Sequence, residues 1–282
     1  MFPEKYANMH LHSTYSDAGF TPNQLVKIGK ALGYGALVLT DHETDGGCKE
    51  FIEYAQKEGL ESVSGTEFYG LVDGFNAHLT ALDFDQNDPG IRALIKERCD
   101  AARDIAKARL EKGLAMGMYS GISFQDVEDR YEEGTWLCID SIRNTMIAKK
   151  CLPDNFDWAN FRWTLFKCPE AKAMENKPDA ERVIRTVRKA GGVVALAHPY
   201  KQTHLVEKLV GYGLNGIEVS HPDLYENTAY LALQAADTFN LYHCGGTDHT
   251  GPMSCCGGIH AVPAFHGITE EEFFTIKERR LG

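Results

Sequence analysis

The residues best suited to chemistry in this sequence are histidines and acids that end or follow short apolar runs, spread along most of the chain. The set comprises His10, His12, His42, Glu67, His78, His198, Asp248 and His249. His10 and His12 alone are weak support for a metal site, because any strand places residues i and i+2 on one face. Imidazole and carboxylate groups without thiolates suit Mn²⁺, Fe²⁺ or Zn²⁺. This many candidate ligands exceeds the need of one tetrahedral ion, so the sequence predicts two or three divalent ions that share a bridging carboxylate.

The elements that must position these residues alternate between short apolar runs and helical patterns. Buried strands are expected at 8–11, 36–39, 193–197, 216–219 and 241–244, with helix signals between them. One such signal is Thr21-Pro22-Asn23-Gln24, which provides an N-cap, a proline at the first helical position and a glutamine three residues after the cap. The alternation indicates βα units and a parallel barrel, in which strand ends converge on the face that holds catalytic groups.

This alternation is interrupted in the middle of the chain. The segment 91–113 has the pattern of one long charged helix, and the remainder to about 177 contains helical fragments and loops with few strand runs. We therefore predict three parts: a first part of the barrel at 1–90, a helical insert that covers the active site at 91–178, and a second part of the barrel at 179–282.

The chain is acidic overall. Its 282 residues include 29 Lys and Arg against 40 Asp and Glu, a formal net charge of −11. Polymeric nucleic acid is therefore not expected as a stable partner, because binding to its phosphates needs a basic face. The sequence has no run of about 20 apolar residues and no secretory pattern at its start, and its eight cysteines contain no Cys-x-x-Cys pair. We expect no membrane partner, reduced thiols (Cys255 and Cys256 among them) and a cytoplasmic location.

Six short motifs contain most of the candidate ligands. They are HLHSTYSD at 10–17, TDHET at 40–44, GTEF at 65–68, AHL at 77–79, LAHP at 196–199 and GGTDHTGP at 245–252. In order and spacing they resemble the polymerase-and-histidinol-phosphatase (PHP) superfamily of metal-dependent phosphoesterases. The resemblance implies an α/β fold, namely a distorted (βα)7 barrel of PHP type with a helical insertion, and a centre of two or three divalent ions (Mn, Fe or Zn).

The resemblance also implies which residues bind the ions. One ion would be held by His10, His12, Glu67 and Asp248, a second by Glu67, His78 and His198, and a third by Asp17 and His42. The chemistry of such a cluster predicts the reaction: hydroxide held by the ions would attack phosphorus in line, and His198, His221 or His249 would protonate the leaving oxygen, a choice that the sequence leaves open. The last motif departs from the family pattern Asp-x-His, because His249 stands one position early and Thr250 takes the expected place. Either an altered loop brings His249 to the third ion or that ion lacks this ligand.

The insert resembles that of the superfamily branch that cleaves small phosphates. The segment 141–145 (SIRNT) corresponds to a stretch with Arg-Pro-His in that branch, and 168–171 (CPEA) stands where Gly-Lys-Pro-Ala is usual. The expected phosphate-binding residues are Arg143 first and then Arg103, with Lys167 or Lys172 as substitutes for the missing lysine. For either arginine, a solvated charge on the helix surface is the alternative interpretation, and for the lysines the alternative is that neither substitutes.

The loss of cations from the insert favours a substrate other than the usual nucleotide bisphosphate of that branch. The leading hypothesis is a cyclic phosphodiesterase that acts on phosphoribosyl 1,2-cyclic phosphate. The alternatives are a nucleotide 3′,5′-bisphosphate phosphatase or short-RNA 5′-exonuclease, a histidinol phosphatase, an amide or ester hydrolase with a similar metal cluster, and a non-catalytic PHP module. The leading hypothesis implies a small phosphorylated substrate.

Overall fold

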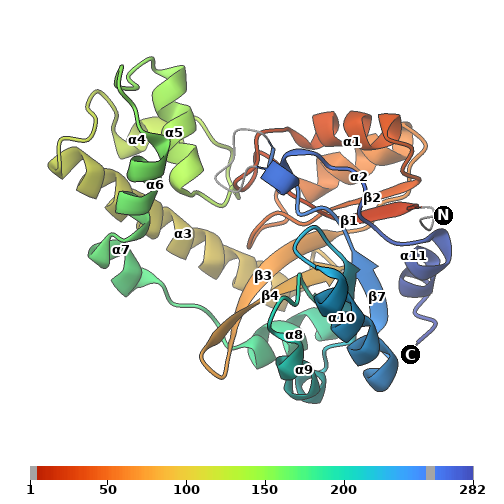
Figure 1. Ribbon diagram of the computed structural model, residues 1–282. Coiled ribbons are helices and arrows are strands. Elements are labelled where there is room, and N and C mark those ends of the chain that lie inside the picture. The colour runs from red at the N-terminus through yellow and green to blue at the C-terminus, as the bar shows by residue number, and fades with distance from the viewer. Residues whose placement is uncertain (1–4, 252–257, 282) are drawn as a thin grey trace.

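The computed structural model describes residues 5–251 and 258–281, and its strands form two sheets (Figure 1). The first sheet pairs β1 (Ala7–Leu11) in parallel with β2 (Ala36–Leu39). The second has the order β3-β4-β5-β6-β7, with β3 at Gly65–Val72, β4 at Phe75–Leu82, β5 at Val193–Leu196, β6 at Gly216–Ser220 and β7 at Tyr242–Gly245. The five strands expected from the sequence are thus confirmed to within one residue at each end. Pro252, Cys255 and Cys256 lie outside the described residues.

Helices follow most of the strands and also fill the middle of the chain. They are α1 (Pro22–Ala31), α2 (Cys48–Lys57), α3 (Pro89–Ala115), α4 (Phe124–Glu128), α5 (Ile139–Ala148), α6 (Trp158–Phe166), α7 (Pro169–Met174), α8 (Ala180–Lys189), α9 (Val206–Tyr212), α10 (Glu226–Phe239) and α11 (Glu270–Lys277), with short 3₁₀ turns at Thr203–Leu205 and Gly258–Ala261. The expected cap of α1 is confirmed, because the Thr21 hydroxyl accepts from the Gln24 N–H while the Gln24 side chain accepts from the Thr21 N–H. None of the helices in the described ranges combines the length and the apolar character that a bilayer span requires.

The prediction of a parallel barrel is only partly right. Strands β3 and β4 pair antiparallel, as do β4 and β5, and the two sheets do not close into one continuous barrel. The reason is local: only Asp73 and Gly74 separate β3 from β4, which leaves no room for a crossover helix. Both residues have positive φ, 49° and 80°, as a two-residue hairpin turn of the Asp-Gly type requires.

Backbone hydrogen bonds nevertheless join the two sheets where the candidate ligands lie. The N–H of Asp248 donates to the His10 carbonyl at 2.9 Å, and the N–H of His12 donates to the His249 carbonyl at 3.1 Å. On the other side of the site, the N–H of Glu67 donates to the Asp41 carbonyl at 3.1 Å. The ends of β1 and β7 and the loop after β2 are therefore fixed next to the first residues of β3.

Alternate residues of both sheets share one apolar core. It comprises Ala7, Met9, Ala36, Val38, Val63, Leu82, Val193, Ala195, Tyr242, Cys244, Ile268, Phe273 and Ile276. A second core forms between the other face of the larger sheet and helices α3, α8, α9 and α10. Because β5 is buried on both faces, its four residues are all apolar, as expected of a strand between two layers.

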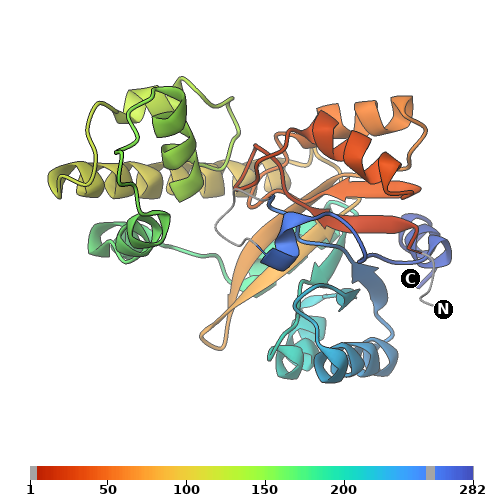
Figure 2. The same cartoon turned by 45° about the horizontal axis from the view of Figure 1, so that its top comes forward.

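Helices α3–α7 lie to one side of the sheets in both views (Figures 1 and 2). They have an apolar core of their own, in which Ala106 and Leu110 of α3 pack with Ile142 and Met146 of α5 and Phe161 of α6. The long helix expected at 91–113 is confirmed as α3, which extends two residues further at each end. The domain boundaries at 90 and 178 stay a prediction.

Candidate metal centre

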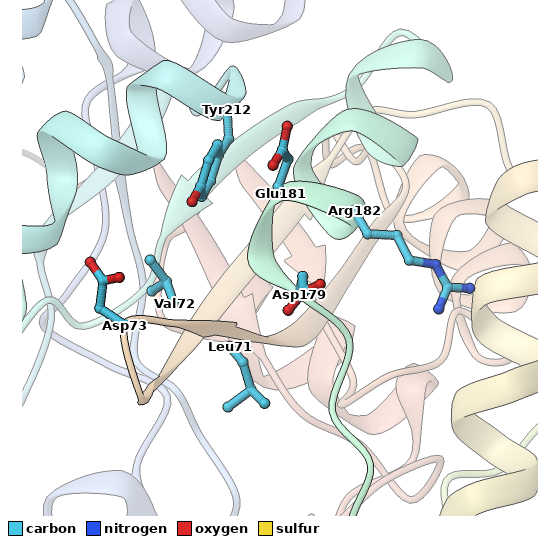
Figure 3. A pocket seen from close by; sticks show the side chains of 7 residues that line it. All are labelled: Leu71, Val72, Asp73, Asp179, Glu181, Arg182 and Tyr212. Carbon is cyan, nitrogen blue, oxygen red and sulfur yellow. The ribbon is translucent and has the colours of Figure 1, made fainter.

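One surface pocket can be set aside first because it contains none of the candidate site residues. It lies at the β3–β4 hairpin beside α8 and α9 and is lined by Leu71, Val72, Asp73, Asp179, Glu181, Arg182 and Tyr212 (Figure 3). Its charged groups point in different directions around an open groove. A cluster of histidines and acids at the ends of β1 and β7 is the stronger candidate.

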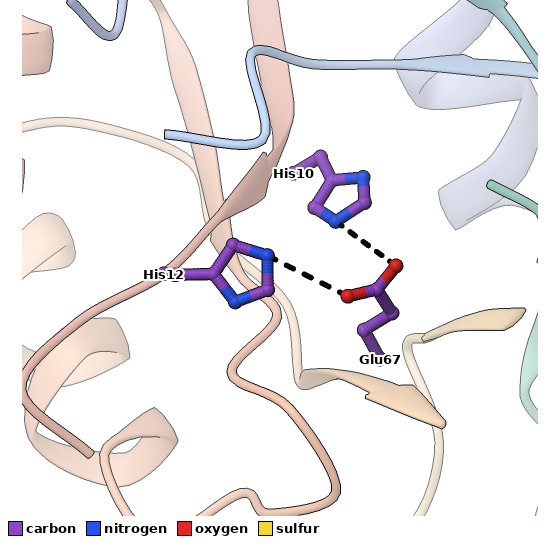
Figure 4. A group of neighbouring side chains, drawn as sticks. All are labelled: His10, His12 and Glu67. Atoms are coloured by element: carbon purple, nitrogen blue, oxygen red, sulfur yellow. Dashed lines mark ion pairs between the residues drawn. The ribbon is translucent and has the colours of Figure 1, made fainter. Parts of the chain in front are cut away.

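Glu67 lies at the centre of this cluster, where its two carboxylate oxygens face His10 and His12 (Figure 4). The distances are 3.5 Å from His10 Nε2 to Glu67 Oε1 and 3.6 Å from His12 Nε2 to Glu67 Oε2. Asp248 completes the group, with its Oδ1 atom 3.6 Å from His10 Nε2 and 2.9 Å from His12 Nε2. The four residues that the resemblance assigned to one ion are therefore brought together.

The residues assigned to the second and third ions surround the same carboxylate. His78 Nδ1 is 2.9 Å and His198 Nε2 is 3.2 Å from Glu67 Oε1. On the opposite side, His42 Nδ1 is 2.8 Å from Glu67 Oε2, and His42 Nε2 is 3.7 Å from Asp17 Oδ2. Glu67 can thus bridge groups from both sides.

The residues present fit divalent cations. Several buried polar atoms of the cluster have no hydrogen-bond partner among the described residues; they include His10 Nε2, both ring nitrogens of His12 and Glu67 Oε2. Leaving such atoms buried without a partner costs free energy, and a cation that accepts their lone pairs removes that cost. Among the described residues, four groups of ligand atoms lie within 4.8 Å of one another: His10/His12/Glu67, His10/Glu218/His221, His12/Asp17/His42 and Glu67/His78/His198. Nitrogen and carboxylate donors without sulfur are the ligand type of Mn²⁺, Fe²⁺ or Zn²⁺.

The electrostatics of the cluster keep its acids ionised. Burial raises the pKa of Glu67, but the neighbouring imidazoles of His78, His10 and His42 more than offset this effect and hold it well below its usual value. Burial lowers the pKa of His42, whereas the Glu67 and Asp17 carboxylates raise it to about 10. The same field that holds a proton on His42 would hold a cation, since the carboxylates stabilise either positive charge.

Glu218 is a residue that the sequence reasoning missed. Its Oε1 atom accepts a hydrogen bond from His10 Nδ1 at 2.8 Å, and its Oε2 atom accepts from the backbone N–H of His198 at 2.6 Å. The hydrogen bond from His10 Nδ1 to Glu218 leaves His10 Nε2 free to act as the ligand atom. The sequence offers one signal for this residue: Glu218 is an acid among the apolar residues at the start of β6, and a buried carboxylate needs a hydrogen-bond or ion-pair partner.

The three candidate proton donors lie at different places in the cluster. The Nε2 atom of His198 faces Glu67 Oε1, so this histidine lies in the position of a metal ligand. His221 Nδ1 accepts from the N–H of Asp223 at 3.0 Å, so the neutral ring carries its proton on Nε2, 3.6 Å from Asp248 Oδ2. His249 donates from Nδ1 to a carbonyl at 2.9 Å and stacks on Phe20; its Nε2 is buried, and no hydrogen-bond partner for it occurs in the described ranges.

His249 lies outside the ligand groups found among the described residues, so its assignment to a third ion stays a prediction. His260, which the sequence reasoning did not select, approaches the site instead. Its Nδ1 is 3.0 Å from the Asp248 carbonyl, and its Nε2 is 3.4 Å from Asp223 Oδ1. No motif signals this residue, because it reaches the site through the chain that returns after β7.

The four cations proposed for phosphate binding are placed differently. Arg143 is buried beneath Trp158, with 4.3 Å between guanidinium and ring centroid, and its Nη2 is 3.1 Å from Asp140. Arg103 pairs with Glu128, on the helical part of the molecule. Lys167 lies 3.8 Å over the Trp163 ring, and Lys172 is exposed on α7. Their role in binding a substrate stays a prediction.

A mixed α/β fold whose strand ends collect histidines and carboxylates around one glutamate is typical of a metal-dependent enzyme. The family model described as "PHP domain" matches residues 8–230. The chain therefore belongs to the PHP family.

Similar proteins agree with this assignment. The 5′-3′ exoribonuclease of Haemophilus influenzae is 27% identical over 91% of this chain and 92% of its own. The phosphoribosyl 1,2-cyclic phosphate 1,2-diphosphodiesterase of Eggerthella lenta is 27% identical over 86% and 94%, respectively. The 3′,5′-nucleoside bisphosphate phosphatase of Chromobacterium violaceum is 22% identical over 87% of each chain. Among solved structures, a putative metal-dependent phosphoesterase of Bifidobacterium adolescentis has a TM-score of 0.80 at 22% identity, with 98% of this chain and 97% of the other aligned.

Proposed function

We propose that the protein is a metal-dependent phosphoesterase that hydrolyses a small phosphorylated substrate. The observation that carries this proposal is the position of Glu67, whose two oxygens face histidines on both sides of the site. Divalent cations bound there would lower the pKa of a water molecule and neutralise the charge of a phosphoryl group. The family supports the same chemistry, because its similar members are named as phosphodiesterases, phosphatases and exoribonucleases.

The chain's own residues have three tasks in this reaction. His10, His12, Glu67 and Asp248 hold the centre together, and Glu218 fixes the orientation of His10. We assign protonation of the leaving oxygen to His221, with His198 and His249 as the alternatives. The Nε2 atom of His221, which carries the proton, lies 3.6 Å from Asp248 Oδ2, while the backbone N–H of Asp223 keeps Nδ1 occupied. A donor must be held in one tautomer, and this hydrogen bond does so.

For the substrate, phosphoribosyl 1,2-cyclic phosphate remains our first proposal. The Eggerthella lenta relative, which is named for that activity, supports it. A nucleoside 3′,5′-bisphosphate is the second candidate, supported by the named activity of the Chromobacterium violaceum relative. The identities of 22–27% favour neither, so the choice needs a direct assay.

The test is a hydrolysis panel followed by ³¹P NMR, which detects opening of a cyclic ester as well as release of phosphate. The panel contains phosphoribosyl cyclic phosphate, nucleoside 3′,5′-bisphosphates, short RNA and histidinol phosphate, each with the Mn²⁺-loaded protein. Turnover that Glu67→Gln abolishes is the expected result. Absence of turnover on every phosphoester, with metal bound, would overturn the proposal in favour of a non-catalytic module.

A further inference from the structure

Glu43 is a fully buried acid that directly follows His42 but lies outside the ligand groups of the described residues. Its backbone has a positive φ of 56°. A residue other than glycine is strained in this left-handed region, and it stays there only when its surroundings hold it. The contacts of Glu43 must therefore be strong enough to fix the loop after β2 in this conformation.

Glu43 is bonded to the backbone of β3 at two points. Its backbone N–H donates to the Glu67 carbonyl at 2.8 Å, and its Oε1 atom accepts from the backbone N–H of Tyr69 at 2.8 Å. The N–H of Glu67 in turn donates to the Asp41 carbonyl at 3.1 Å. Both backbone groups of Glu67 are thus bonded to the loop that contains His42, so the separation of these two ligands depends on this pairing.

The second oxygen of Glu43 is bonded to the helical segment, by which we mean helices α3–α7. Glu43 Oε2 accepts from Nε of Arg98, which lies near the middle of α3. Arg98 is also buried, and its Nη1 atom donates to the carbonyl of Asn176, in the stretch that connects α7 to α8. A buried charge is tolerated only while its partner remains in place. The ion pair therefore fixes Glu43 to α3.

The effect of Glu43 on the metal centre is indirect, because each of its carboxylate oxygens already accepts a hydrogen bond. His42, the preceding residue, has its Nδ1 atom 2.8 Å from Glu67 Oε2. A functional cluster needs its side chains held within about 0.5 Å of the productive geometry. A shift of the Glu43 backbone would move His42 relative to Glu67 and exceed this tolerance easily.

We propose that the Glu43–Arg98 ion pair positions the metal centre by holding His42 and Glu67 at the separation that divalent cations require. Glu43 and Arg98 are positioning residues, since neither belongs to the ligand groups found among the described residues. Helix α3 thereby takes part in metal binding although the ligands come from the strand ends and loops. This inference rests on the proposed function, because it concerns the same ligands.

The experiment measures Mn²⁺ affinity by competition with a chelator. Glu43→Gln keeps an acceptor for the Tyr69 N–H but removes the charge that pairs with Arg98. We expect Glu43→Gln and Arg98→Met each to lower the affinity about 10-fold or more, the usual effect of losing a group that orients a ligand. Because both substitutions break one contact, the double variant should lose much less than the product of the two single losses. Arg98→Lys keeps the charge and should recover most of the affinity.

Hydrogen exchange of the metal-free protein gives a readout that needs no bound ion. Peptides that cover 40–46 and 65–69 should exchange faster in Glu43→Gln, because the backbone bonds between the loop and β3 weaken, while β7 should be unaffected. A general loss of stability would accelerate exchange in β7 as well. Arg98→Met leaves Glu43 buried without its partner, so the double variant, which removes both charges, tests the inference if the single variant does not fold.

A second ion pair between α3 and the same loop provides the matched control. Arg92 pairs with Asp45, which also accepts from Gln86 Nε2 at 2.9 Å, and within the described ranges the Asp45 carboxylate makes no hydrogen bond to β3. Arg92→Met should therefore leave Mn²⁺ affinity unchanged. Wild-type affinity in Glu43→Gln and in the double variant, or an equal loss in Arg92→Met, would overturn the inference while the proposed function stands. A wild-type protein that binds no Mn²⁺ would overturn the proposed function itself.

Discussion

The Glu218→Gln substitution tests whether the centre depends on the orientation of its histidines. Glutamine keeps the shape of the side chain but offers one acceptor oxygen where the carboxylate offers two. Glu218 now accepts from His10 Nδ1 and from the backbone N–H of His198, so one of these donors would face an amide NH₂ group. Loss of such a partner lowers metal affinity about 10- to 100-fold, or about 1.4–2.8 kcal/mol of binding free energy.

The assay is competition between the protein and a chelator for Mn²⁺, with bound metal measured by mass spectrometry. Glu272→Gln provides a matched control, because Glu272 accepts from His243 Nδ1 at 2.9 Å, a carboxylate–histidine pair outside the ligand groups. We expect weaker Mn²⁺ binding for Glu218→Gln and unchanged binding for Glu272→Gln. Equal affinity of the two variants for Mn²⁺ would refute the assignment of Glu218 as the residue that positions His10.

Three further predictions concern stability. Saturating Mn²⁺ at about 100 times its Kd should stabilise the metal-free protein by about 2.7 kcal/mol and raise Tm by roughly 5–10 °C in calorimetry, and Glu67→Gln should show no such rise. Arg143→Ala should lower the free energy of unfolding by about 3 kcal/mol in urea titrations because it leaves Asp140 buried without this ion pair, and adding Asp140→Asn should recover part of the loss. Burial raises the pKa of Glu272, but hydrogen bonds from His243 and the Thr269 backbone lower it to about 2. The stability from this depressed pKa is present above the unfolded value of 4.5 and is lost as pH falls toward 2, so the cost of Glu272→Gln should be measurable at about pH 6 and vanish at about pH 2.

The sequence could predict most of the candidate centre because its members are fixed by short-range features. His10 and His12 alternate on one strand, and a strand places such residues on the same face. Glu67 and Asp248 stand next to strand ends that backbone hydrogen bonds then join. The antiparallel pairing of β3 and β4 was missed although Asp73-Gly74 is a strong hairpin signal, because the regular βα alternation on both sides favoured a parallel arrangement.

The pocket that Tyr69 of β3 and Arg98 and Arg109 of α3 line could not be predicted, because it depends on which face of α3 packs toward the sheet. Arg98 and Arg109 lie eleven residues apart on this helix, three turns, with Ala102 and Ile105 between them on the same face. Charges occur all around the helix, so periodicity alone does not show which of them face the sheet. Lys177 is a single basic residue before α8, and its position over the Tyr69 ring depends on how the helical segment packs against β3. The candidate metal centre thus follows from local patterns along the chain, whereas the pocket beside it follows from tertiary packing.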